Sequence, residues 1–402
     1  MKPPFQKATH QQTKTYNSQL VLKTIYDHGR ISRADVARHT RLTRTTVSSV
    51  VADLIEKGLM EEVGHGPSAG GKAPILLSVI DDARHLIGID LANGEFRGAV
   101  VNLRGEIRHA IYRPLQGRQG ENALEMVYEL VNALKSAATR PLLGIGIGTP
   151  GLIDTTNGVV CQAVNLDWRD LPLRSILQAR YNLPIYLAND SHVAALAEYI
   201  FGSGQNMTNL VVVKVGEGIG AGIVIGGQLF QGDGYGAGEI GHTTVVENGL
   251  RCPCGNLGCL ETVASTRAIL ERARAVAQTE PGSALHQFVA RPVDLTLEAL
   301  GEAFQSGDEA SQRIILEAGH YLGIAVSHLV NTLNIQHISI LGSLTRFGSP
   351  FLEAVREEML RRSLSALARE TQVSYADLGQ DVVILGASAL LLTHELGLGL
   401  IR

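Results

Sequence analysis

The first 80 residues combine short apolar stripes of helical period with turn-forming residues between them. Residues 18–28 place their apolar side chains on one helical face, which predicts a first helix. Shorter helices are predicted for residues 33–39 and 44–57, because Ser32 and Thr43 precede them and both residue types cap helix N-termini. Three short helices, with a tight turn between the second and the third, predict a helix-turn-helix.

The third predicted helix has two faces of opposite character. Its apolar stripe consists of Val47, Val50, Val51, Leu54 and Ile55. Its opposite face opens with short polar side chains and one guanidinium group: Arg44, Thr45, Thr46, Ser48 and Ser49. Small side chains let a helix enter the major groove of DNA, where Ser and Thr reach phosphates or base edges and Arg pairs with guanine. We therefore predict that this face, together with Arg33, contacts double-stranded DNA.

The segment after this helix, residues 59–79, has the pattern of a strand, a glycine-rich tip and a second strand. This pattern predicts the wing of a winged helix, and Lys72 in its tip is predicted to lie along the phosphate backbone of DNA. Residues 1–75 hold 11 Lys/Arg and 6 Asp/Glu, which leaves 24 and 33 of the chain's 35 Lys/Arg and 39 Asp/Glu for the remainder. A basic segment on an acidic body favours a polyanionic partner for the N-terminus alone. The alternative is a small helical bundle that binds another protein.

Two similar sets of apolar runs follow this segment. Residues 84–115 contain three runs that are divided by glycine-containing turns, and a second set begins at Asn209. This weak internal repeat predicts two lobes, each built from a β-meander followed by α/β structure. An amphipathic helix is predicted between the sets, at 121–138. The apolar stretch 382–396 is predicted to form a helix that packs back on the core.

The composition is that of an ordinary globular protein, with 45% hydrophobic and 18% charged residues among 402. This length allows two or three domains with sizeable cores. The polar N-terminus lacks the apolar stretch of a signal peptide, and no apolar run approaches the roughly 18 residues of a membrane span. We therefore expect a cytoplasmic protein with no membrane partner, in which cysteines stay reduced.

One histidine and three cysteines form a compact cluster in the sequence: His242, Cys252, Cys254 and Cys259. Three thiolates and one imidazole are the four-ligand set that zinc takes in closed tetrahedral sites. Four protein ligands leave zinc no open position for water, so we predict one structural zinc ion per chain and no hydrolytic centre. The alternative is a set of buried thiols in a reducing compartment, but turn-forming residues surround these cysteines. Cys161 stands apart and is expected to be an ordinary buried thiol.

The stretch GEIGHTTV, followed by CPCGNLGCLE, closely resembles the signature of the ROK family, which contains bacterial sugar kinases and sugar-responsive repressors. Residues 31–60 also resemble the DNA-binding half of ROK repressors that respond to xylose or N-acetylglucosamine, a part that ROK kinases lack. The resemblance implies an N-terminal winged helix-turn-helix (α+β) plus an α/β two-lobed hexokinase/actin-like (RNase H-like) fold of the ATPase type. The predicted domains are 1–80 for the winged helix, 81–202 plus 388–402 for lobe 1, and 203–387 for lobe 2 with its zinc-binding loop.

The resemblance also implies which residues bind a sugar in a cleft between the lobes. Asp190 matches the base that takes a proton from the sugar hydroxyl in ROK kinases, and Asn189 matches a residue that holds the sugar. Further sugar contacts are implied for Asn165, Glu239, His242 and Glu261. Carboxylates, amides and an imidazole suit sugar hydroxyls, which both donate and accept hydrogen bonds. The alternative is that these residues are helix caps and neighbours of the zinc ligands.

The two loops that hold the ATP phosphates in ROK kinases are altered in this chain. The first resembles D-x-G-G-T-K in the kinases and is D-L-A-N-G-E here, from Asp90 to Glu95. The second resembles G-T-G-x-G and is G-E-G-I-G here, with Glu217 in place of the hydroxyl residue. Like charges at ~4 Å cost on the order of 1 to 4 kcal/mol, so carboxylates in these loops oppose phosphate binding. We therefore predict no catalytic residue, with Asp190 accepting a hydrogen bond from the sugar instead of serving as a base.

Together these features predict a sugar-responsive transcriptional repressor, a homodimer or homotetramer that a sugar or sugar phosphate releases from a DNA operator. The sugar is expected to close the lobes and change the spacing of two winged helices in a dimer, so that they no longer match two half-sites. Two alternatives remain open: an active sugar kinase that carries a DNA-binding domain, and a regulator controlled by a protein partner.

Overall fold

Three helices and three short strands form the N-terminal domain of the computed structural model, which describes residues 9–67, 73–92, 94–205, 207–280, 283–288 and 291–399. The helices are α1 (His10–His28), α2 (Arg33–Thr40) and α3 (Arg44–Glu56). The strands β1 (Ile31–Ser32), β2 (Met60–His65) and β3 (Ile75–Val79) pair antiparallel in the order β1-β3-β2. β2 and β3 form the predicted wing, which confirms the winged helix, but the predicted DNA contact Lys72 lies outside the described residues.

The predicted helix caps of the winged helix are present. The hydroxyl groups of Ser32 and Thr43 each accept a hydrogen bond from the backbone N–H group three residues later. α1 begins eight residues earlier than predicted, because Thr9 and Gln12 form a capping box at a polar end that has no apolar period. Ile55 is 36% exposed, so its predicted place in the apolar stripe of α3 was wrong.

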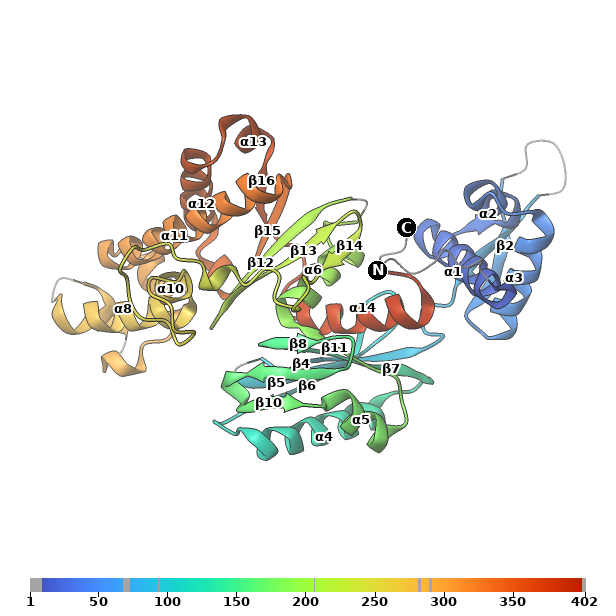
Figure 1. Ribbon diagram of the computed structural model, residues 1–402, viewed down its shortest axis with the longest axis horizontal. Coiled ribbons are helices and arrows are strands. Elements are labelled where there is room, and N and C mark those ends of the chain that lie inside the picture. The colour runs from blue at the N-terminus through green and yellow to red at the C-terminus, as the bar shows by residue number, and fades with distance from the viewer. Residues whose placement is uncertain are drawn as a thin grey trace.

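Two five-stranded sheets with the same topology form the rest of the chain (Figure 1). The first contains β4 (His85–Asp90), β5 (Glu95–Val101), β6 (Ile107–Pro114), β7 (Leu142–Thr149) and β11 (Ile185–Asn189), in the order β11-β7-β4-β5-β6. The second contains β12 (Leu210–Val215), β13 (Ile219–Ile225), β14 (Gln228–Phe230), β15 (His337–Gly342) and β16 (Gln372–Tyr375), in the order β14-β13-β12-β15-β16. Each sheet begins with an antiparallel meander, and two later strands add in parallel beside its first strand. The predicted internal repeat is therefore confirmed.

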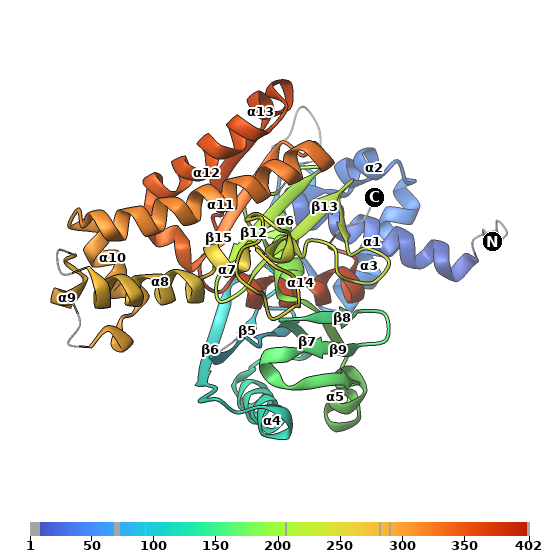
Figure 2. The same ribbon diagram turned by 60° about the vertical axis from the view of Figure 1, so that its left-hand side comes forward.

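Lobe 1 is built on the first sheet. The helices α4 (Gly120–Ala137) and α5 (Leu173–Tyr181) pack on one side of it, where Figure 2 shows them together. A small antiparallel sheet lies beside them, formed by β8 (Leu152–Asp154), β9 (Val159–Ala163) and β10 (Trp168–Leu171). The buried side chains of these elements share one hydrophobic core with β4 and β7.

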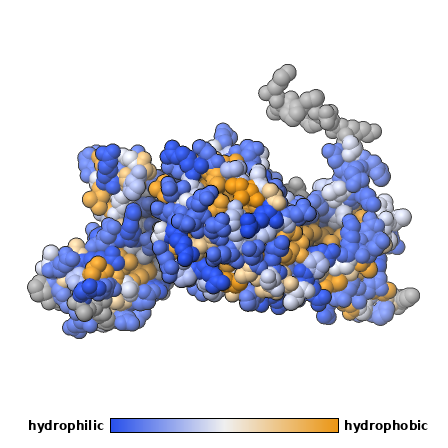
Figure 3. Space-filling view, turned by 90° about the horizontal axis from the view of Figure 1, so that it is seen from below, coloured by the Kyte–Doolittle hydropathy of each residue, from blue (hydrophilic) through white to orange (hydrophobic). Residues whose placement is uncertain are grey.

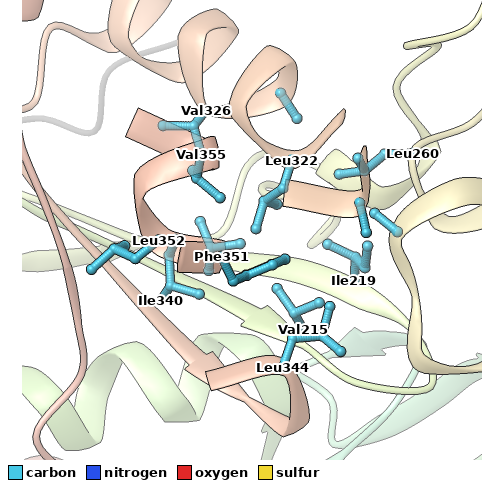
Figure 4. Close-up of a cluster of buried hydrophobic side chains, with 14 of the residues drawn as sticks. Val215, Ile219, Leu260, Leu322, Val326, Ile340, Leu344, Phe351, Leu352 and Val355 are labelled. Carbon is cyan, nitrogen blue, oxygen red and sulfur yellow. The ribbon is translucent and has the colours of Figure 1, made fainter. Parts of the chain in front are cut away.

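Lobe 2 is built on the second sheet, and its helices gather on the side away from lobe 1 (Figure 1). They are α7 (Glu261–Ala264), α8 (Thr266–Thr279), α9 (Leu285–Phe288), α10 (Leu297–Gln305), α11 (Glu309–Leu333), α12 (Gly348–Arg362) and α13 (Ser365–Glu370). Figure 4 shows Phe351 of α12 in the middle of this core, between Leu322 of α11 and the strand residue Ile340. Val215 and Ile219 belong to the same core, so it anchors both ends of the loop that joins β12 to β13.

Two helices, α6 (Asp190–Ile200) and α14 (Val382–Leu396), lie between the two sheets (Figures 1 and 2). A Cβ atom at Gly146 of β7 would collide with the backbone oxygen of Ala387 in α14. A Cβ atom at Gly386 of α14 would collide with the backbone oxygen of Val193 in α6. α14 is the predicted C-terminal helix, and the domain boundary that we place at residue 388 falls inside it.

The winged helix shares a hydrophobic core with lobe 1. Val21 and Leu22 of α1 belong to one buried cluster with Leu391 and Leu392 of α14. The Tyr26 hydroxyl donates a hydrogen bond of 2.7 Å to the backbone oxygen of Leu103. The Arg104 guanidinium donates to the backbone oxygen of Tyr26 at 2.7 Å and stacks over its ring at 4.0 Å. The winged helix is therefore packed onto lobe 1 and is not joined to it only by a linker.

The surface seen in Figure 3 is mainly hydrophilic, with apolar groups gathered near the centre of this face. Exposed apolar side chains are a normal part of protein surfaces and do not by themselves indicate a binding site. Among the described residues, no helix is long and apolar enough to cross a membrane.

We predict that Tyr26→Ala destabilises the protein by about 3 to 5 kcal/mol, because it removes a buried aromatic ring from the core between the winged helix and lobe 1. Urea unfolding followed by circular dichroism measures this change. Tyr16→Ala is the matched control, since Tyr16 lies on the same helix and is 53% exposed. Equal stability of the two variants would contradict the shared core.

Candidate functional site

The predicted metal ligands come together at the edge of lobe 2. His242 lies at the end of a short 3-10 helix, Ile240–His242, and the three cysteines follow in the loop that leads to α7. His242 Nδ1 lies 3.6 Å from Cys252 Sγ, and Cys254 Sγ lies 3.7 Å from Cys259 Sγ. All four ligand atoms lie within 4.8 Å of one another.

These distances fit a tetrahedral ion. Sulfur atoms that bind one zinc ion at about 2.3 Å are separated by about 3.7 Å in a regular tetrahedron. The thiols of Cys252 and Cys259 are buried, whereas Cys254 is exposed, so the site lies at the surface of the loop. The structure therefore supplies a set of one imidazole and three thiols that could hold a metal ion.

The backbone of the cysteine loop is shaped for this arrangement. The N–H group of Cys252 donates to the oxygen of Asn256, and the N–H group of Gly255 donates to the oxygen of Cys252. Gly258 has φ +68° and lies against the backbone oxygen of Val246, where a Cβ atom would collide. Only glycine fits this position, so the turn brings Cys259 back toward His242.

The predicted sugar-binding residues Asp190, Glu239, His242 and Glu261 lie in one neighbourhood. The second ring nitrogen of His242, Nε2, lies 3.9 Å from a carboxylate oxygen of Glu239. Burial raises the pKa of Glu239, His242 opposes this effect, and the negative charges of Asp190 and Glu261 raise the pKa further. Glu261 also accepts a hydrogen bond of 3.1 Å from the backbone of Ile219.

Asn189 is at the site but is already engaged. Its side-chain oxygen caps α6 by accepting from the backbone of Ser191 at 2.8 Å, and its amide donates to the oxygen of Gly151 at 3.0 Å. Asn165 lies in an exposed 3-10 turn, Val164–Leu166, where its backbone oxygen accepts from Gln119. Within the described part of the chain, Asn165 shares no hydrogen bond or ion pair with the other predicted sugar residues.

Two charged residues that we did not predict as site residues lie beside Asp190. Lys214 of β12 donates a hydrogen bond of 2.9 Å to Asp190. Asp90, at the end of β4, is buried, and its Oδ1 atom has no hydrogen-bond partner. The sequence signal for Lys214 was a single charge in an otherwise apolar run, NLVVVKV. Asp90 was visible only as the first residue of an altered phosphate loop.

The charges of these three residues are coupled. Burial raises the pKa of Asp90 to about 7, Lys214 lowers it and Asp190 raises it. Burial also opposes ionisation of Asp190, but the charge and hydrogen bond of Lys214 outweigh this effect and hold the pKa of Asp190 below its usual value. The group therefore contains one ionised pair, Lys214 with Asp190, beside Asp90, which gains and loses its proton near neutral pH.

The predicted DNA-facing residues lie mostly on the outside of α3. Arg44, Thr45, Ser48 and Ser49 are exposed, and their spacing places them on one side of the helix. Thr46 is half-buried, and its hydroxyl lies 2.9 Å from that of the cap residue Thr43.

Ion pairs divide the basic residues of the winged helix into two groups. The predicted DNA contact Arg33 is held by Glu62 of the wing at 2.7 Å. Among residues 9–67, the basic side chains without an ion pair are Arg30, Arg41, Arg44 and Lys57. Arg44 is the first residue of α3 and Arg41 lies in the turn before it, so two basic side chains without an ion pair lie at the N-terminal end of α3.

The two altered phosphate loops differ in how their acidic residues are placed. Glu95 opens β5 and lies 3.6 Å from the guanidinium of Arg97, so its charge is partly neutralised. Glu217 is exposed in the loop between β12 and β13.

We predict that Asp90→Asn stabilises the protein at pH 8 more than at pH 5. Because the folded-state pKa of about 7 lies above the unfolded value of 3.8, the folded protein retains a proton that the unfolded chain loses, and the contribution of Asp90 to stability falls as pH rises through this window. The difference in the free energy of unfolding between the variant and the wild type should grow in favour of the variant by on the order of 2 to 3 kcal/mol between pH 5 and pH 8. Urea unfolding across this range measures it, and a difference that does not change with pH would contradict the assignment.

Comparisons with known proteins agree with both parts of the fold. Residues 86–394 match the ROK family, and residues 15–59 match a winged helix-turn-helix DNA-binding model. The xylose repressor of Caldicellulosiruptor bescii is 36% identical over 392 residues, covering 96% of this chain and 98% of that protein. The DNA-binding transcriptional dual regulator NagC of Escherichia coli K12 is 30% identical over 386 residues, covering 94% of this chain and 92% of that protein.

A solved structure extends the similarity to the whole architecture. A ROK family transcriptional regulator, described as a homolog of the E. coli MLC protein, superposes with a TM-score of 0.85 at 27% identity. The match covers 96% of this chain and 98% of that chain, so it includes the winged helix as well as both lobes. The chain therefore belongs to the ROK family and carries an N-terminal winged helix-turn-helix domain.

Proposed function

We propose that this protein is a transcriptional repressor that binds a DNA operator through its winged helix and is released by a sugar bound between its two lobes. The observation that carries the proposal is that a winged helix and a candidate sugar site are both connected to lobe 1. A DNA-facing helix shares a hydrophobic core with lobe 1, and lobe 1 supplies Asp190 to a site rich in hydroxyl-binding groups. The names of the relatives, a xylose repressor and a DNA-binding regulator, support the same reading.

DNA binding is assigned to the exposed face of α3. The short side chains of Thr45, Ser48 and Ser49 let the helix approach base edges, and the unpaired guanidinium of Arg44 can contact guanine or a phosphate. Arg41, beside Arg44, adds positive charge at the same end of the helix. Arg33 contributes only if it leaves its ion pair with Glu62.

Sugar binding is assigned to Asp190, Glu239, His242 and Glu261, with Asn189 holding the N-terminus of α6 in place. Carboxylate oxygens accept hydrogen bonds from sugar hydroxyls, and the imidazole can donate or accept. The geometry of Glu239 supports this role, because its carboxylate lies 3.9 Å from Nε2 of His242 and the two groups can contact the same hydroxyl. Asn165 remains a predicted sugar contact.

We propose zinc as the metal of the cysteine loop. His242 Nδ1, together with Cys252, Cys254 and Cys259, would hold it, and this donor set is typical of structural zinc. Zinc on Nδ1 would fix the orientation of the imidazole and leave Nε2 facing Glu239. The loop that carries His242 and Glu261 would then keep one shape with or without sugar.

Release from DNA is proposed to follow closure of the lobes in a homodimer or homotetramer. Two half-sites on DNA demand a fixed spacing between two winged helices, so a small rotation of one protomer lowers affinity steeply. Because the winged helix packs on lobe 1, a change in the angle between lobes moves it as part of that lobe. Linkage then requires that DNA weaken sugar binding by the same factor.

The alternative of an active kinase is disfavoured by Glu217, which lies exposed where a kinase of this family has a hydroxyl residue. ATP consumption with any hexose would favour it. The third possibility, control by a protein partner, would be favoured if no sugar changed the stability of the protein.

Fluorescence anisotropy tests the proposal directly. The protein is titrated onto DNA from upstream of its own gene at fixed salt, because phosphate contacts make affinity steeply salt-dependent. Xylose, N-acetylglucosamine, glucose and their phosphates are then added in turn. Release by one of them supports the repressor and identifies the effector, whereas DNA binding that no sugar changes would contradict the sugar-responsive part.

We predict that Arg44→Ala weakens operator binding by about 10- to 100-fold, since one arginine contact to a base contributes about 1 to 3 kcal/mol. The same anisotropy assay measures the loss. Lys57→Ala is the matched control, because Lys57 is an exposed cation without an ion pair at the opposite end of α3. A similar loss in both variants would indicate nonspecific charge attraction instead of a recognition helix.

We predict that Cys254→Ser lowers the zinc content from one ion per chain to less than about half, since a serine hydroxyl is a poor replacement for a zinc thiolate. Sugar affinity should fall with it, because His242 and Glu261 flank the same loop. Mass spectrometry measures the zinc content, and calorimetry measures the sugar affinity. Cys161→Ser is the control and should leave both unchanged; zinc that stays at one per chain in Cys254→Ser would overturn the assignment.

A further inference from the structure

Lys214 pairs the second sheet with the start of α6 at the proposed sugar site. It extends from β12 of lobe 2, and its ammonium group lies 2.9 Å from a carboxylate oxygen of Asp190, the first residue of α6. Both side chains are largely enclosed, at 23% and 13% exposure. An ion pair of this kind is strong because few water molecules compete with it.

The alternation of β12 explains why Lys214 points toward this site. Val213 and Val215 are fully buried in the core of lobe 2, so the residue between them projects from the opposite face of the sheet. That face packs on α6, since Val212 shares a buried cluster with α6. Opposite Lys214 in the ladder stands Gly220, where a Cβ atom would meet the Ser191 hydroxyl at 2.5 Å.

Lys214 also neutralises more than one acid. The charges of Asp90 and Asp190 both stabilise its ammonium form and raise the pKa of Lys214, although burial opposes this effect. Asp90 Oδ1 remains buried without a hydrogen-bond partner. One cation is therefore paired with Asp190, the first residue of α6, and is also influenced by the charge of Asp90 at the end of β4.

We propose that Lys214 determines what this site does with a sugar: it keeps Asp190 as a hydrogen-bond acceptor and takes the place that a divalent cation would need between Asp90 and Asp190. The site then binds a sugar hydroxyl but does not prepare it for phosphoryl transfer. The inference rests on the proposed sugar site and deepens it by naming the residue that separates binding from catalysis.

The two parts of this role have separate physical reasons. A carboxylate that is paired with an ammonium group is a weak base, because taking a proton breaks the ion pair. Phosphoryl transfer from ATP also needs a magnesium ion, which binds carboxylate oxygens. A fixed positive charge among the same carboxyl groups repels that ion. The residues of this site therefore do not fit the magnesium that a kinase of this fold requires.

Manganese binding tests the second part without any sugar. Zinc-loaded wild-type protein is compared with Lys214→Gln, which retains a hydrogen-bond donor but loses the charge, and with Lys214→Arg, which retains the charge. We expect Lys214→Gln to bind one Mn²⁺ about tenfold or more tightly than the wild type, as followed by electron paramagnetic resonance. Lys214→Arg should behave as the wild type, and adding Asp190→Asn to Lys214→Gln should abolish the gain.

Sugar affinity tests the first part. The sugar that releases the protein from DNA in the anisotropy assay is used here. Lys214→Gln should lower the affinity for that sugar about tenfold, because Asp190 no longer has a partner that keeps it ionised beside Asp90. Lys214→Arg should restore most of the affinity. If no sugar of the panel binds the wild type, the proposed function fails, but the manganese comparison still decides the role of Lys214.

Two outcomes would overturn the inference. One is a Lys214→Gln variant that binds Mn²⁺ and sugar as the wild type does, which would make Lys214 a structural tie between the lobes. The other outcome is saturable Mn²⁺ binding by the wild type that is abolished by Asp90→Asn or Asp190→Asn. This result would show that a divalent cation can bind beside these carboxyl groups although Lys214 is present. It needs no Lys214 variant, so it applies even if Lys214→Gln does not fold.

Discussion

The close packing of α6 against α14, between two sheets, is the constraint on which the rest of the structure depends. Backbones approach this closely only where no side chain lies between them. Gly146 allows β7 to contact α14, and Gly386 allows α14 to contact α6. A methyl group at either position would separate a sheet from a helix or one helix from the other. Since Asp190 is the first residue of α6, the same packing fixes where the acidic group of the inter-lobe site lies.

The site combines fixed and adjustable parts. The cysteine loop and the cap made by Asn189 hold backbone segments in place from opposite lobes. Between them, the Lys214 ammonium group holds the pKa of Asp190 below its usual value. In the function that we propose, a ligand that contacts Asp190 acts where α6 meets β12, and it changes the angle between the lobes only if it binds one arrangement of them better than another. The shared core between the winged helix and lobe 1 would carry such a change to the exposed face of α3.

Much of this arrangement was predictable because local chemistry decided it. Ser32 and Thr43 are helix caps wherever a helix follows them, and the repeat of apolar runs fixed two sheets of the same topology. The clustering of His242 with three cysteines follows from their spacing in the sequence and from the glycine turns of the loop. These are short-range patterns, and each agrees with the global fold.

Contacts between distant segments were not predictable in the same way. The pairing of Lys214 with Asp190 joins a strand to a helix that begins 24 positions earlier, and no local pattern brings these two residues together. The start of α1 was missed because a polar helix end has no apolar period to reveal it. The core between the winged helix and the C-terminal helix was likewise invisible, although each half was predicted.

That core has a consequence for the order in which the protein is made. The winged helix is synthesised well before Leu391 and Leu392 of α14, which cover part of its apolar surface. At about 5 to 20 residues per second, the roughly 300 residues between them take on the order of 15 to 60 seconds to synthesise. Until then a nascent chain carries a DNA-binding module with an uncovered apolar flank. The core beneath the winged helix is therefore completed only after α14 has been synthesised.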